Sequence, residues 1–261
     1  MKRHSFFNAF KRLRISHLLQ RYAIPDDEWH RTIRQLPLVA NRPPAERVRL
    51  RVLTTLLLHR KVFTGVQGLE LTPAMKIVIA SQACLEILQL GLAAFDGWHE
   101  VIVYPGAFRV RREVQDELGL VHSDSRALSG EAWMRGPVIL SWDEVVQDSF
   151  QLRKGHNVVL HEFAHKLDML NGRANGMPPL HPDMPIEAWT QSLSEAYEQL
   201  VRRVGHHHAD INPYAATDPA EFFAVICEYF FTAPEILDEH YPRVYQQLKA
   251  YFRQDPLGVM D

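Results

Sequence analysis

The alternation of apolar and polar positions predicts a chain that is mostly helical. Apolar residues recur at three- and four-residue intervals through long stretches, which is the spacing of one face of an α-helix. Proline and aspartate at positions 25–27 mark a further helix start, and the chain turns helical again from Asn157. The main helices are expected over residues 6–19, 45–61, 73–95, 186–204, 219–232 and 241–252.

Two short segments have the character of strands instead. Residues 101–104 form an apolar run that Pro105 and Gly106 stop, and residues 138–141 form another such run. Residues 108–110 are expected to continue the first strand. A small sheet ahead of a central helix, in an otherwise helical chain, indicates an α+β fold.

The composition is that of a folded protein that does not bind nucleic acid directly. The 261 residues are 46% hydrophobic, which is enough to bury a core. The chain carries 29 basic and 31 acidic residues, and its formal net charge is −2. Binding to phosphates needs a surplus of lysine and arginine, so this balance argues against that function class.

No segment is expected to cross a membrane, and the protein is expected in the cytoplasm. The most apolar region, residues 77–95, is interrupted by polar side chains, whereas a spanning helix needs about 20 mostly apolar residues. Cys84 and Cys227 lie among apolar neighbours and read as reduced, buried thiols. Residues 1–22 are basic but lack a secretory pattern. We interpret them as a solvated helix; a helix that binds a membrane surface and an organelle transit peptide are the alternatives.

The central helix contains a metal-binding pattern, HExxH, formed by His161, Glu162 and His165. Helix positions four apart differ by about 40° around the axis, so the two imidazoles point the same way and can share one metal ion. Glu162 lies about 100° from His161, which places it beside the ion. A carboxylate there can accept a proton from an attacking water molecule, as a general base in peptide hydrolysis.

The surroundings make HExxH more specific than the bare pattern. By composition alone, roughly one chain in twenty of this make-up would contain it by chance. Here it lies in an apolar predicted helix that Asn171 and Gly172 would end. Lys166 departs from the extended pattern, which usually has an uncharged residue at that position.

A catalytic zinc ion needs a third protein ligand, and three carboxylates compete for that role. Asp168 faces the right way but is short, so we expect it to orient an imidazole through its other ring nitrogen, or to lie on the surface. Glu221 follows an expected helix cap at Asp218 and Pro219, so it is either the ligand or part of a capping box. Glu228, on the same helix face, is the rival ligand or a satisfied polar residue.

Four segments carry a resemblance to a known family. The chain resembles the Mlc titration factor A family of bacterial zinc peptidases at residues 97–106, 155–169, 212–216 and 219–224. Its catalytic region is also similar to the peptidase domain of anthrax lethal factor. There a tyrosine lies seven residues before the glutamate ligand, as Tyr214 does before Glu221.

The resemblance implies a zincin-like, gluzincin-like metallopeptidase core with a small sheet and an HExxH active-site helix. It implies one zinc ion per chain, with His161, His165 and Glu221 as ligands and Glu162 as general base. Tyr214 would then donate a hydrogen bond to the oxyanion; otherwise it is a packed loop aromatic. We expect a single zincin-like domain over residues 1–261, with a helical portion at 1–72 and a catalytic core at 73–261.

The resemblance also implies a function. It suggests hydrolysis of short peptides with aminopeptidase character, and a strand at 101–104 or 138–141 could pair with an extended substrate. It suggests regulation of glucose uptake through binding of a glucose-responsive transcriptional repressor. The alternative is a non-catalytic protein that sequesters the repressor and has a structural or vestigial zinc site. His99, His156, His181 and the run at 206–208 are expected to be structural or on the surface.

Overall fold

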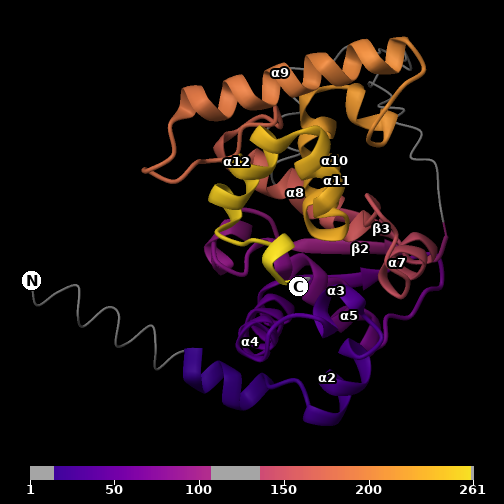
Figure 1. The fold of residues 1–261 in the computed structure, drawn as a ribbon. Helices are drawn as coiled ribbons and strands as arrows, with labels where there is room; N and C mark the ends of the chain where they lie inside the picture. Colours follow the sequence, from indigo (N-terminus) through magenta and orange to yellow (C-terminus); the bar gives the residue numbers. More distant parts are fainter. Residues whose placement is uncertain (1–14, 107–135, 260–261) are drawn as a thin grey trace, which may run out of the picture.

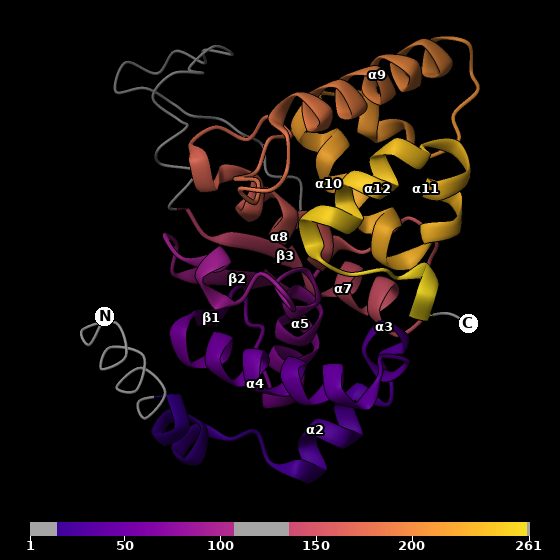
Figure 2. The same cartoon turned by 60° about the vertical axis from the view of Figure 1, so that its left-hand side comes forward.

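A computed structural model describes residues 15–106 and 136–259. Its sheet has three parallel strands in the order β1-β2-β3, with Val62 opposite Glu100 and Val101 opposite Val138. Figures 1 and 2 show this sheet between the N-terminal helices on one side and α8, α9 and α10 on the other. The strands are β1 (Val62–Gly65), β2 (Glu100–Tyr104) and β3 (Val138–Ser141). The α-helices are α2 (Asp26–Ile33), α3 (Pro37–Ala40), α4 (Pro44–Arg60), α5 (Pro73–Glu86), α7 (Trp142–Ser149), α8 (Val158–Asp168), α9 (Ile186–Gly205), α10 (Pro219–Thr232), α11 (Pro234–His240) and α12 (Pro242–Phe252). Short 3-10 helices are η1 (Leu92–Phe95), η2 (Met169–Asn171), η3 (Pro213–Ala216) and η4 (Leu257–Val259).

Most helices lie where the apolar spacing predicts them. The boundaries of α10 match the prediction, and those of α4, α9 and α12 differ from it by one residue. Local capping explains the sharp starts, because the Thr72 hydroxyl accepts the Met75 N–H and Asp218 caps α10. The mostly helical α+β class is therefore confirmed in its coarse form.

Several features of the fold differ from the sequence prediction. The helix expected over 73–95 is wrong, because α5 ends at Glu86 and Gly91, with a φ of +82°, separates it from η1. Strand β1 was not predicted; its Val62 N–H donates to the His99 carbonyl at the start of the sheet. Helices α3, α7 and α11 were not predicted. The strand expected at 108–110 lies outside the described residues. Most of the helix expected at 6–19 also lies outside them, and the described chain is helical from residue 15 to residue 22.

One buried cluster extends through the described chain and supports the central helix α8. Phe163 of α8 packs with its ring 5.1 Å from that of Phe95 and 5.6 Å from that of Trp98. Cys84 and Cys227 are buried and free. Within the described ranges, no helix combines the length and the apolar character that crossing a bilayer requires.

Candidate metal centre

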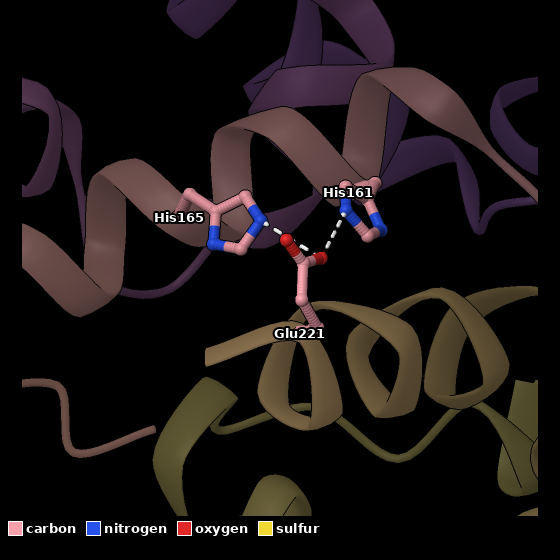
Figure 3. A group of neighbouring side chains, drawn as sticks. All are labelled: His161, His165 and Glu221. Atoms are coloured by element: carbon pink, nitrogen blue, oxygen red, sulfur yellow. Dashed lines mark hydrogen bonds and ion pairs between the residues drawn. The ribbon is translucent and has the colours of Figure 1, made fainter. Parts of the chain in front are cut away.

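Three side chains from two helices converge on one point. His161 and His165 come from α8 and Glu221 from α10, and their ligand atoms all lie within 4.8 Å of one another. Figure 3 shows the Glu221 carboxylate facing both imidazoles. Its Oε2 lies 3.0 Å from His161 Nε2 and 3.4 Å from His165 Nε2. The structure therefore brings together the three residues expected to bind metal.

Helix α8 holds the two histidines on one face for local reasons. Asn157 caps the helix, because its Oδ1 accepts the Leu160 N–H at 3.0 Å. The opposite face is apolar, and residues such as Phe163 and Leu167 are fully buried. Gly172, with a φ of +127°, lies just beyond the short 3-10 turn that follows α8. The pattern of burial thus turns His161 and His165 toward the cavity.

Helix α10 presents Glu221 in its first turn. Asp218 Oδ1 accepts the N–H groups of Ala220 and Glu221 at 2.9 and 3.0 Å, so it is the cap. A capping box would direct the glutamate side chain back to the Asp218 N–H. In the structure the Glu221 carboxylate meets the two imidazoles instead. The capping-box interpretation therefore does not account for its orientation.

Glu228, the rival ligand, lies on the far side of His161. Its Oε1 is 2.8 Å from His161 Nδ1, while its Oε2 accepts the Asn157 N–H at 2.5 Å. Asn157 in turn donates through Nδ2 to Gln82 Oε1 of α5 at 2.7 Å. Glu228 thus contacts the ring nitrogen that points away from Glu221, and it fastens the start of α8 to the second half of α10.

Asp168 does not contact an imidazole in the way that its spacing suggested. Its two oxygens accept the N–H groups of Gly176 and Met177, each at 2.8 Å. The expected hydrogen bond to an imidazole is therefore wrong. The physical reason is that the loop after α8 folds back over Asp168, which sequence spacing cannot show.

The charges of the site favour a bound cation. Burial alone would lower the pKa of His161, but hydrogen bonds to Glu221 and Glu228 outweigh it and raise that pKa to about 10. Burial alone would raise the pKa of Glu221, yet its hydrogen bonds with His161 and His165 hold it well below the usual range. The raised pKa favours the protonated, cationic form of His161 between these two carboxylates when no metal is bound. A zinc ion fits the same place, because two imidazole nitrogens and one carboxylate oxygen are donors that zinc prefers.

A cavity of about 590 Å³ opens beside these residues. Glu162, Lys166 and Tyr214 line it. Burial raises the pKa of Glu162, while the two neighbouring histidines act against that rise. The Tyr214 ring lies 6.0 Å from that of His161, and burial together with Glu221 raises the Tyr214 pKa to about 12. Its hydroxyl is therefore protonated at neutral pH and can donate a hydrogen bond.

The residues behind the site were the hardest to find in the sequence. Gln82 and Glu86 of α5 are buried, and Gln82 reaches the α8 cap through Asn157. Neither oxygen of Glu86 has a hydrogen-bond partner among the described residues. In the sequence, these two residues stand out only as polar positions inside an otherwise apolar helix. That pattern argues against a membrane span but does not indicate a link to the metal centre.

Replacing Glu86 with glutamine should stabilise the protein increasingly as the pH rises. Burial raises the Glu86 pKa well above its usual 4.5, so the folded protein keeps a proton that the unfolded chain releases above that pH. The free energy of unfolding therefore falls as the pH rises through this window. Melting temperatures at pH 5 to 8 test this, with Glu70→Gln at an exposed position as control. A gain that does not grow with pH would contradict it.

The other histidines lie away from the centre. His181 Nε2 lies 2.8 Å from the Tyr251 carbonyl, and residues 206–208 are exposed after α9. Neither His99 nor His156 lines the cavity. The described structure therefore gathers only His161 and His165 at the candidate centre.

Comparison with known proteins gives consistent similarities. The family model described as glucose-regulated metallo-peptidase M90 matches residues 8–253. Proteins named Mlc titration factor A from Yersinia pestis (strain Pestoides F) and Yersinia pseudotuberculosis (strains IP 31758 and YPIII) are each 43% identical over 235 residues. The aligned region covers 88% of this chain and 86% of each relative. The matched family region includes both helices of the candidate centre.

Proposed function

The chain belongs to the glucose-regulated metallopeptidase family M90, and from that premise we propose that it is a zinc-dependent peptidase. The observation that carries this proposal is the convergence of His161, His165 and Glu221 beside an open cavity. Membership in a metallopeptidase family supports a metal at that point. The donor set supports zinc, with one ion per chain.

The proposed mechanism assigns a role to each side chain. His161, His165 and Glu221 would hold the zinc ion, which when bound supplies Lewis acidity. Glu162 takes a proton from the attacking water and returns it to the leaving amine. Tyr214, a hydrogen-bond donor at neutral pH, stabilises the oxyanion that develops on the peptide carbonyl.

We propose short peptides with a free amino terminus as substrates. Residues 139–141 of β3 line the cavity, so an extended peptide could pair with this strand. Glu144 and Asp218 also line it, and their carboxylates would attract a terminal ammonium group. These positions support aminopeptidase character.

Metal removal and restoration test the peptidase proposal. The purified protein should contain about one zinc ion per chain and hydrolyse chromogenic amino-acid and short peptide amides. A chelator should abolish hydrolysis, and added zinc should restore it. Amino-blocked versions of the same peptides should react poorly. If the zinc-loaded protein cleaves neither free nor blocked peptides, the proposal is wrong.

A second function, repressor binding, is favoured by the relatives' name. They are called Mlc titration factor A, and the family description includes glucose regulation. We propose that this chain also binds a glucose-responsive repressor, through the helices of residues 1–72. Loss of operator binding by the repressor when this protein is added would support it. If that loss occurs without any peptidase activity, the non-catalytic alternative holds.

We also propose a zincin-like single-domain architecture and a cytoplasmic location for this protein. A zincin-like arrangement over one domain, with residues 73–261 as catalytic core, fits the cluster of buried side chains that extends from Ile24 to Phe252. Two buried free thiols fit the reducing cytoplasm.

A further inference from the structure

The position of Asp168 disfavours the ionised form of its carboxylate. It is fully buried at the end of α8, where the negative end of the helix dipole disfavours an anion. Burial raises its pKa to about 6, while the N–H groups of Gly176 and Met177 lower it. Its two hydrogen bonds to these N–H groups offset this cost. We call these three residues the Asp168 latch.

The loop held by the Asp168 latch presses against the start of α10. Gly176 has a φ of +76°, and a Cβ atom there would lie 2.8 Å from the Pro219 carbonyl oxygen. Trp189 of α9 donates from Nε1 to the Gly176 carbonyl at 3.0 Å, which holds the loop from the other side. A continuous contact path therefore runs from the end of α8, through Gly176, to the first residue of α10.

This path reaches both the metal ligands and the cavity. Pro219 lies two residues before Glu221, and Ala174 and Asn175 of the loop line the cavity. At the opposite end, Glu228 fastens α10 to the start of α8. The two antiparallel helices are thus fastened at both ends, with the candidate metal centre between.

We propose that Asp168 is a positioning residue for the metal centre: through Gly176 it sets Glu221 and the cavity wall relative to the two histidines. The proposal deepens the proposed peptidase function and rests on it. Asp168 touches neither metal nor substrate. Its effect is expected in the affinity for zinc and in the binding of substrate.

The competing explanation is direct orientation of His165 by Asp168. Both Asp168 oxygens already accept loop N–H groups. His165 Nδ1 is buried, and it has no hydrogen-bond partner within the part of the chain that the structure describes. The contacts therefore favour an action through the loop.

Three variants separate these explanations. Asp168→Asn keeps the shape but leaves one oxygen to accept two N–H groups. Gly176→Ala displaces the loop from Pro219 without altering Asp168 or His165. Asp148→Asn is the matched control, because Asp148 is also buried and accepts an N–H of α8, from Val158 at 3.1 Å, but at the far end from the loop.

The measurements are amide hydrogen exchange in the metal-free protein, zinc affinity by chelator competition, and steady-state kinetics with saturating zinc. Asp168→Asn and Gly176→Ala should both accelerate exchange at residues 176 and 177. Both should weaken zinc binding about tenfold, as removal of groups that position metal ligands does. KM should rise while kcat changes little, and Asp148→Asn should leave all three measurements near those of the wild type.

Two results would overturn the proposal. Unchanged exchange, zinc affinity and KM in Asp168→Asn would show that the latch positions nothing. Weaker zinc binding in Asp168→Asn but not in Gly176→Ala would show that Asp168 orients His165 directly and does not act through the loop. Exchange and zinc affinity need no substrate, so a wild type without hydrolysis would refute the peptidase function and leave the latch to be decided by these two measurements.

Discussion

The Glu162→Gln variant is expected to keep its zinc and to lose peptide hydrolysis by about three orders of magnitude. Glutamine has nearly the same shape but cannot take a proton from water or return it to an amine. Glu162 lines the cavity beside His161 and His165 and is outside the group of three convergent side chains. Zinc content and kcat, measured on the same preparation, test the prediction.

Tyr214→Phe provides a matched comparison within the same cavity. It removes one hydrogen-bond donor and leaves the proton acceptor in place, so kcat should fall by about two orders of magnitude. The loss in Glu162→Gln should be the larger of the two.

Full hydrolysis by Glu162→Gln would refute the role of Glu162 as general base. Loss of zinc from this variant would show that Glu162 acts on the metal.

The Glu221→Gln variant is expected to lose most of its zinc. The Glu221 carboxylate lies 3.0 Å from His161 Nε2 and 3.4 Å from His165 Nε2, so an amide there removes the anionic donor from the centre. With two imidazoles left, zinc affinity should fall by more than two orders of magnitude, beyond the about 10–100-fold effect of groups that only support ligands. Metal analysis after dialysis and chelator competition measure the change.

Glu228→Gln is the control for the Glu221 prediction, and it has a different expected outcome. Glu228 contacts the opposite nitrogen of His161 and can fix the orientation of that ring. Its glutamine variant should still bind one zinc ion, with affinity lowered about tenfold. If Glu228→Gln loses zinc and Glu221→Gln retains it, the choice of the third ligand is wrong.

The parts of this fold that sequence could predict depend on local signals. Helix α10 begins at Pro219 because Asp218 caps it and proline suits the first turn, and all of this lies within four residues. The HExxH face likewise depends only on helix geometry. Capping also placed Glu221 at the start of its helix, although it left open where the side chain points.

The parts that sequence could not predict depend on distant partners. Strand β1 forms because Val62 pairs with Glu100, and its residues do not alternate between buried and exposed positions. Glu228 and Asp168 were open alternatives because their partners lie on another helix or in a loop. Their contacts depend on how α8, α10 and the loop at 172–177 pack together.

The fastening of α8 and α10 at both ends has a practical consequence for protein engineering. The chain between the two helices passes through α9 and the exposed turn at residues 206–208. None of the contacts described for the centre comes from that turn, so we expect the centre to tolerate an insertion there. A fluorophore or an inserted tag at this turn would therefore report on the protein while leaving the geometry of the centre intact.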